Sequence, residues 1–148
     1  LLKTYNFYVK KKLFSSNKIV KYPDHKEWFE QLYLKQKKIH IFVSKIKKVK
    51  IGYIRFDNVK KNIFEISLAL KRDYIGLGLG TKMLKITLKK FLFKKNFIIV
   101  SKVKKNNKNS ISCFKQNNFA EISFKKKFFY KLNNTSNYYY FKHVDKFK

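Results

Sequence analysis

Hydrophobic and polar residues along this chain follow two different spacings, and each spacing predicts a different kind of element. Apolar and polar residues alternate over 39–56 and again over 62–70. Alternation with a period of two is typical of strands that bury one face. We therefore expect two strands joined by a turn near residues 45–48, then a third strand, together forming an antiparallel meander.

Three other segments have the three-to-four-residue spacing of helices. Residues 24–36 follow the only proline and place Asp24 and Glu27 at capping-box spacing. A second helix is expected over 81–95 and a shorter one around 109–116. The predicted apolar faces consist of Trp28, Leu32 and Leu34 in the first helix, and of Met83, Leu84, Leu88, Phe91 and Leu92 in the second.

The remaining hydrophobic segments complete the sheet. Residues 96–103 form a short, almost continuous apolar run, which indicates a buried strand. Residues 119–130 and 137–144 are interpreted as two closing antiparallel strands. This order of elements predicts an α/β fold in which a mixed, mostly antiparallel central sheet is flanked by helices.

Length and composition indicate one domain. The chain has 148 residues, of which 45% are hydrophobic, and we expect a single domain over 1–148. No apolar run approaches the roughly 20 residues that cross a bilayer, which favours a soluble protein. Cys113 is the only cysteine, so an internal disulfide is excluded, and we expect no metal site and a cytoplasmic location. We interpret Cys113 as a core residue rather than a nucleophile.

The formal net charge of +29 raises the question of nucleic-acid binding. Only Arg55 and Arg72 are arginines, although base readout and bidentate phosphate contacts favour arginine. The lysines are spread along the chain, and Lys, Asn, Ile, Phe and Tyr are enriched together, as a very AT-rich genome would encode. We interpret the charge as composition bias, and expect no specific nucleic-acid partner and no membrane partner.

Three of the four glycines lie in "IGLGLG", residues 75–80, between the third strand and the following helix. The unpaired N–H groups and dipole of a helix's first turn bind anions, and bare backbone lets a phosphate approach. The spacing fits no dinucleotide fingerprint, because Thr81 stands where a glycine is needed. It fits no P-loop either, because Gly80 is followed by Thr81 and then Lys82. The alternative is a flexible turn without a ligand.

A second segment, residues 103–119, opens a helix with Asn107 and Ser110 three positions apart. Together with the glycine turn it resembles the GCN5-related N-acetyltransferases (GNAT), from about residue 25 onward. In that family a glycine-rich turn binds the pyrophosphate of acetyl-CoA, and Val103, Asn107, Ser110 and Phe119 are in register with a later motif. The resemblance implies acetyl-CoA as co-substrate and a binding site made by Gly76, Leu77, Gly78, Leu79, Gly80, Thr81, Asn107 and Ser110.

The chain departs from the family pattern at three positions. Ile75 stands where the family has Arg or Gln, which removes one pyrophosphate contact. Phe114 stands where many members carry a tyrosine thought to protonate the departing thiolate, so the general acid is unassigned. Asn118 replaces the glycine before Phe119, and asparagine tolerates the same left-handed backbone.

Three further blocks indicate a subfamily: "HKEWF" at 25–29, "IGYIRFDN" at 51–58 and "EISLAL" at 65–70. Their order and spacing resemble the acetyltransferases that act on the 4-amino group of a UDP-linked amino sugar in pseudaminic and legionaminic acid biosynthesis. Those enzymes occur alone or fused behind a nucleotide-sugar hydrolase. The opening "LLKTYN" resembles the part of such a domain after its first strand. We therefore expect that this strand is missing and that Leu1 is a cut rather than a start.

The resemblance implies direct transfer in a ternary complex. The amine attacks the thioester carbonyl, whose oxyanion is held by backbone N–H groups around Leu68 and Leu70. The amine must lose a proton before it attacks, so a base is needed. Glu65 is the candidate, because alternation places it on the face opposite Phe64 and Ile66. The alternative role for Glu65 is a cross-strand ion pair with a lysine.

His25 and Trp28 lie one helical turn apart and are candidates to line the acceptor pocket. The alternatives are a core tryptophan and a solvated histidine. Three hypotheses stay open: a sugar-amine acetyltransferase, a ribosomal-protein-like N-terminal acetyltransferase, and a non-catalytic basic RNA-binding or scaffold protein. The sequence fixes neither the acceptor amine nor the oligomeric state.

Overall fold

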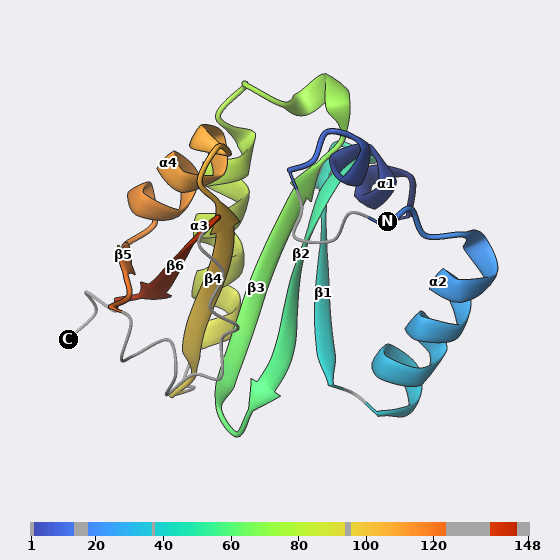
Figure 1. The fold of residues 1–148 in the computed structure, drawn as a ribbon, viewed down its shortest axis with the longest axis horizontal. Coiled ribbons are helices and arrows are strands. Elements are labelled where there is room, and N and C mark those ends of the chain that lie inside the picture. The colour runs from blue at the N-terminus through green and yellow to red at the C-terminus, as the bar shows by residue number, and fades with distance from the viewer. Residues whose placement is uncertain (1, 14–17, 37, 94–95, 124–136, 145–148) are drawn as a thin grey trace.

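The computed structural model describes residues 2–13, 18–36, 38–93, 96–123 and 137–144 (Figure 1). In these residues a six-stranded sheet with strand order β1-β2-β3-β4-β6-β5 is combined with helices. The strands are β1 (Ile39–Ile46), β2 (Val49–Lys60), β3 (Ile63–Leu70), β4 (Ile98–Lys104), β5 (Phe119–Glu121) and β6 (Tyr138–His143). The helices are α1 (Leu2–Lys10), α2 (Tyr22–Phe29), η1 (Glu30–Lys35), η2 (Arg72–Tyr74), α3 (Leu79–Leu92) and α4 (Lys108–Gln116).

The predicted α/β fold with a mixed, mostly antiparallel sheet is confirmed. Strands β1, β2 and β3 form the expected meander, and β5 and β6 close the sheet as an antiparallel pair. Among the strands that the structure describes, only β3 and β4 run parallel, because α3 connects them as a crossover. The rest of the segment predicted as a strand over 119–130 lies, from residue 124 onward, outside the described residues.

The parallel pair is short, and this feature shapes the centre of the molecule. Strands β3 and β4 pair only from Ile63 with Ile98 to Ile66 with Ser101. Beyond that point β3 continues to Leu70 and β4 to Lys104 without pairing to each other. The carboxyl ends of the two strands therefore separate in the middle of the sheet, as Figure 1 shows.

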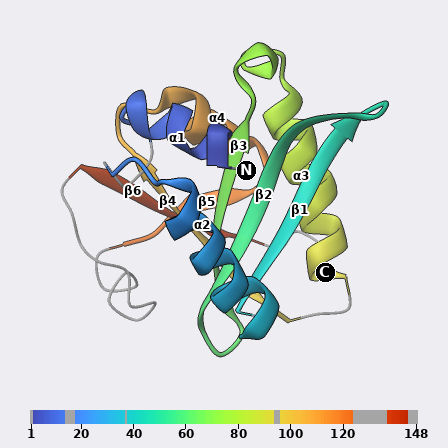
Figure 2. The same ribbon diagram turned by 90° about the vertical axis from the view of Figure 1, so that its right-hand side faces the viewer.

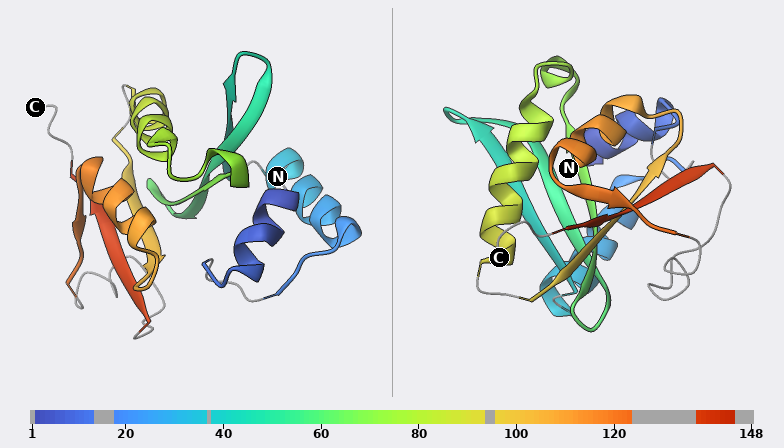
Figure 3. Two further views of the ribbon diagram at one scale, coloured as in Figure 1. Left: turned by 90° about the horizontal axis from the view of Figure 1, so that it is seen from above. Right: turned by 90° about the vertical axis from the view of Figure 1, so that its left-hand side faces the viewer.

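The main hydrophobic core lies between the sheet and helices α3 and α4. It contains Phe56 of β2 and Phe91 of α3, whose rings stack with centroids 3.9 Å apart. The predicted face of α3 is confirmed, since Met83, Leu84, Leu88 and Phe91 are buried there and Leu92 packs against them. Helices α1 and α2 lie on the other face of the sheet (Figures 2 and 3). The described part of the chain has no helix long and apolar enough to span a membrane.

The capping box predicted at Asp24 and Glu27 is wrong. Helix α2 begins at Tyr22 after Lys21, and no side chain caps it. Pro23 lies in the first turn, where its fixed φ and missing N–H suit a helix start, so Asp24 is already inside the helix. The segment then continues as the π-helical turn η1, and Leu34, expected on the apolar face, is 55% exposed.

The fourth glycine, Gly52 of β2, has a packing role. A Cβ there would lie 2.5 Å from the carbonyl oxygen of Ala69 and 2.9 Å from a methyl carbon of Leu70. Gly52 and Leu70 face each other across the β2–β3 pair. Glycine therefore allows the two strands to approach closely just before β3 leads into the glycine turn.

Candidate active site

The glycine turn connects η2 to α3 and exposes bare backbone. Gly76 and Gly78 have φ values of 84° and 68°, in the left-handed region that favours glycine. A Cβ added to either would meet no atom within 4 Å. Gly78 is the N-cap of α3 and gives no side-chain cap, and the first-turn N–H groups after it have no partner inside the helix. This turn fits an anion such as the pyrophosphate of a coenzyme.

The third glycine of the turn serves packing instead. A Cβ on Gly80 would lie 3.6 Å from Leu70 and 3.8 Å from the Sγ of Cys113, both ordinary contact distances. Gly80 therefore faces the core. Leu77 of the same turn is largely exposed. Cys113 is buried in the main core, and burial raises the pKa of its thiol, as the interpretation of a core residue requires.

Helix α4 is held at both ends by asparagines. The side chain of Asn107 caps the helix by accepting a hydrogen bond of 3.2 Å from the N–H of Ser110. Asn118 has a φ of 62°, the left-handed conformation that the sequence predicted. Asn107, Ser110 and Phe114 line one cavity together with residues of β3. The glycine turn does not line that cavity, but the carbonyl of Thr81, directly after the turn, accepts a hydrogen bond of 3.3 Å from the side chain of Asn117 at the end of α4.

The backbone amides at the end of β3 point toward the separated strand β4. Lys71 donates its N–H to the carbonyl of Ile51 on β2. Because amide directions alternate along a strand, the N–H groups of Leu70 and Leu68 point to the opposite side. The N–H of Leu70 donates to the hydroxyl oxygen of Tyr8, at 3.2 Å. Of the two amides expected to hold an oxyanion, Leu70 is thus occupied by α1, and Leu68 lines the cavity.

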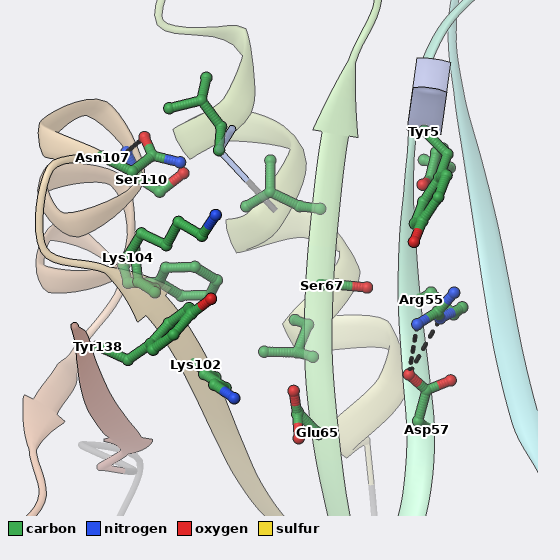
Figure 4. Close-up of a pocket in the computed structure, with 16 residues that line it drawn as sticks. Tyr5, Arg55, Asp57, Glu65, Ser67, Lys102, Lys104, Asn107, Ser110 and Tyr138 are labelled. Atoms are coloured by element: carbon green, nitrogen blue, oxygen red, sulfur yellow. Dashed lines mark hydrogen bonds and ion pairs between the residues drawn. The ribbon is translucent and has the colours of Figure 1, made fainter. Parts of the chain in front are cut away.

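The cavity between β3 and β4 has a volume of about 100 Å³ and contains the predicted base. Figure 4 shows Glu65 on β3, at the lower end of this group of side chains. Residues of β4, α4 and β6 lie on one side of Glu65, and residues of α1 and β2 lie on the other. The first group contains Lys102, Lys104, Asn107, Ser110 and Tyr138, and the second contains Tyr5, Arg55 and Asp57.

Burial and charge perturb the carboxylates of this cavity. Glu65 lies directly opposite Asp57 in the β2–β3 pair, and Asp57 forms an ion pair of 2.8 Å with Arg55. Burial raises the pKa of Glu65, the negative charge of Asp57 raises it further, and Lys102 and Arg55 act in the opposite direction. Within the described residues no ion pair joins Glu65 to a lysine. A carboxylate with a raised pKa is suited to proton transfer near neutral pH.

A second cavity, of about 230 Å³, contains both residues predicted to bind the acceptor. The rings of His25 and Trp28 lie 5.6 Å apart, and the guanidinium of Arg55 lies 5.2 Å from the centre of the Trp28 ring. Tyr5, Tyr53 and Arg55 line this aromatic cavity and the central one, so the two adjoin. Burial lowers the pKa of His25, and the charge of Arg55 acts in the same direction.

A third hollow, of about 770 Å³, adjoins the central cavity on its β4 side. We call it the lysine hollow, because four of its lining residues are Lys10, Lys12, Lys104 and Lys105. Lys104 and Tyr138 line both the hollow and the central cavity. No Asp or Glu of the described residues lines it, so its surface is positively charged.

The sequence analysis missed most partners of Glu65. Tyr53, Arg55 and Asp57 stand two residues apart on β2, so they share the face that Glu65 occupies on β3. Polar residues at that period in an otherwise apolar strand were the available signal. Lys102 and Lys104 repeat the pattern on β4. No group of three potential metal-ligating side chains occurs among the residues that the structure describes.

A family model for the GNAT acetyltransferases matches residues 6–119. The chain belongs to the GNAT acetyltransferase family. The predicted acetyl-CoA-dependent N-acetyltransferase is thereby confirmed. No curated protein matches the chain.

Solved structures share the fold of this GNAT chain at low identity. A ribosomal-protein-alanine N-acetyltransferase from Brucella melitensis has a TM-score of 0.76 and 14% identity, covering 97% of this chain and 91% of its own. The Campylobacter jejuni N-acetyltransferase PseH, in complex with acetyl coenzyme A, has a TM-score of 0.62 and 21% identity, covering 86% and 83%. The putative acetyltransferase yncA from Salmonella typhimurium, with its cofactor acetyl-CoA, has a TM-score of 0.73 and 18% identity, covering 98% and 87%.

Proposed function

We propose that this GNAT enzyme transfers the acetyl group of acetyl-CoA to the amine of a nucleotide-linked amino sugar by direct attack in a ternary complex. The observation that carries the proposal is the position of Glu65, a partly buried carboxylate between the coenzyme residues Asn107 and Ser110 and the aromatic cavity. A base there can reach an amine that enters from the aromatic side.

The donor side is assigned to backbone groups. The amides of Gly76 to Thr81 hold the pyrophosphate, Asn107 and Ser110 line the path of the pantetheine arm, and the N–H of Leu68 stabilises the developing oxyanion. Each assignment uses unblocked backbone or a small polar side chain. A thioester placed at Leu68 lies in the same cavity as Glu65.

The base accepts the proton that the acceptor ammonium must lose. Glu65 takes this proton directly or through one water. Protonation neutralises the carboxylate of Glu65, and burial in the cavity favours the neutral form. Arg55 keeps Asp57 paired, so Glu65 is the carboxylate of this pair that is available for the proton.

Two features next to the central cavity support a nucleotide-linked sugar. The aromatic cavity with Trp28 and His25 provides flat surfaces for a base or a sugar ring. The lysine hollow provides positive charge for a diphosphate.

A second candidate is an N-terminal protein acetyltransferase. The ribosomal-protein-alanine N-acetyltransferase has the higher TM-score, 0.76, and favours this alternative. The positive charge of the lysine hollow opposes it for basic acceptor segments, because like charges repel at that entrance.

Release of free thiol from acetyl-CoA, measured with three acceptors, tests the proposal. We expect turnover with a UDP-linked 4-amino sugar, and little turnover with the unphosphorylated amino sugar or with a basic peptide that has a free N-terminus. Trp28→Ala should raise KM for the nucleotide sugar and leave KM for acetyl-CoA unchanged. Leu34→Ala, an exposed position of the adjoining helical turn, is the matched control. Preference for the peptide would overturn the proposed acceptor in favour of the second candidate.

A further inference from the structure

Acetyl transfer releases a thiolate that needs a proton, and the buried Phe114 of α4 has no proton to give. Phe114 lines the central cavity, so the lack of a donor is a property of the site itself. We propose that the hydroxyl of Tyr138, on β6, donates this proton. The proposal rests on acetyl transfer from acetyl-CoA alone and holds for any acceptor amine.

The sheet brings Tyr138 to the cavity from a strand distant in sequence. Tyr138 is paired with Lys104 across β4 and β6, and therefore shares its face of the sheet. It lines the central cavity together with Leu68, Glu65 and Phe114. Figure 4 shows its hydroxyl directed into the cavity, on the same side of Glu65 as Lys104, Asn107 and Ser110.

The other hydroxyl groups of the cavity are less suited. Tyr53 is more deeply buried, and burial raises its pKa to about 12, which makes it a weak acid. Tyr5 and Tyr53 both line the aromatic cavity on the acceptor side. Ser67 points toward β2 in Figure 4. The side chain of Ser110 remains, but an aliphatic hydroxyl is a much weaker acid than a phenol.

The charged groups that face Tyr138 favour donation. Burial raises the pKa of Tyr138, with Tyr140 acting in the same direction, so the phenol is protonated at neutral pH. The ammonium of Lys102 lies 4.3 Å from the centre of its ring, and Lys104 lines the same cavity. Both cations would stabilise a transient phenolate. The cavity contains two acids, Glu65 and Asp57, and Asp57 is paired with Arg55.

The step balances as a simple acyl transfer. The amine lone pair forms a C–N bond to the acetyl carbon as the C–S bond breaks and its electron pair moves to sulfur. Tyr138 gives its proton to that sulfur, producing the free thiol of coenzyme A. Glu65 passes the first proton of the acceptor ammonium to water before the attack, and then takes the proton that the nitrogen loses as the amide forms. Exchange with water then returns a proton to Tyr138 and removes the one on Glu65, so both groups are restored for the next turnover.

The first test is Tyr138→Phe, which removes only the hydroxyl. We expect kcat to fall on the order of 10²-fold, with KM for acetyl-CoA almost unchanged. The basic limb of the wild-type kcat profile, where the phenol ionises, should disappear. Tyr139→Phe is the matched control, because Tyr139 packs against the main core on the other face of the sheet. A wild-type kcat and basic limb in Tyr138→Phe would overturn the proposal.

A second measurement requires no acceptor and so separates this proposal from the choice of substrate. Calorimetry should show that Tyr138→Phe binds coenzyme A roughly three- to tenfold more weakly, because a hydrogen bond to sulfur is lost. Binding of desulfo-coenzyme A should be unchanged. Equal losses for both ligands would mean that Tyr138 acts only by packing. Phe114→Tyr in the Tyr138→Phe background should restore part of kcat, and a variant with no recovery would count against a shared proton-donor position.

Discussion

Gly78→Val tests whether the glycine turn holds the coenzyme. Gly78 has a φ of 68°, and a Cβ there points into space with no atom within 4 Å. The valine side chain would occupy the position proposed for the pyrophosphate. A residue with a Cβ in this left-handed conformation costs roughly 1–2 kcal/mol. For a domain of this size that lowers the melting temperature by roughly 2–8 °C, so the variant should remain folded at 25 °C.

The loss of affinity should be much larger than the loss of stability. Displacing the pyrophosphate removes at least two charge-assisted N–H···O bonds of roughly 1.5–3 kcal/mol each, which weakens acetyl-CoA binding at least about 100-fold. Gly80→Ala is the matched control in the same turn. Its Cβ would make ordinary contacts with Leu70 and Cys113, so both acetyl-CoA affinity and folding should be retained.

Titration calorimetry with acetyl-CoA, combined with thermal unfolding of each variant, separates the two effects. The expected result is a folded Gly78→Val protein without measurable binding and a Gly80→Ala protein that binds as the wild type does. Wild-type affinity for acetyl-CoA in Gly78→Val would refute the proposal that the glycine turn binds the pyrophosphate. Equal losses in both variants would show that the turn acts only through the folding of α3.

Two further predictions concern Glu65 and Gly52. Glu65→Gln should lower turnover 10²–10⁴-fold at unchanged acetyl-CoA affinity, with partial recovery as higher pH supplies free amine. Because the pKa of Glu65 is raised, the wild-type kcat/KM should decrease as the pH is lowered, beginning at pH values above the ordinary carboxyl pKa, and the variant should lack this acidic limb. Wild-type turnover at every pH would assign Glu65 to a structural role. Gly52→Ala should destabilise the fold by about 1–3 kcal/mol in urea unfolding, since its Cβ would lie 2.5 Å from the Ala69 carbonyl, and an unchanged midpoint would contradict the close approach.

Local chemistry made much of the fold predictable. The alternation over 39–56 and 62–70 matches three observed strands, because one face of each must be buried. Asn107 at the start of α4 and Asn118 after its end could be assigned because each satisfies a backbone requirement that few residues meet. The predicted start of α2 was wrong, because Pro23 and Asp24 are adjacent and each can mark the start of a helix. The helix begins before both, at Tyr22, with Pro23 in its first turn.

The site was less predictable, because it depends on contacts across strands. Glu65 could be named from alternation alone, but the pairing of Asp57 with Arg55, and of Arg55 with Trp28, depends on register and on where α2 docks. Tyr138 on β6 is separated from Glu65 on β3 by five of the twelve described elements, η2 to β5. Neither its place beside β4 nor the early separation of β3 from β4 has a local sequence signal.

Helix α1 and the residues just after it form hydrogen bonds to both separated strands, β3 and β4. The hydroxyl of Tyr8 accepts the amide of Leu70 at the end of β3, and the ammonium of Lys104 on β4 donates to the carbonyl of Lys12 just after the helix. By bonding to both strands, α1 fixes the distance between the ends of β3 and β4 on one face of the sheet. The other face, with α3 and α4, is left for the long coenzyme. The two substrates would then meet head-on from opposite faces, and either product could depart without waiting for the other.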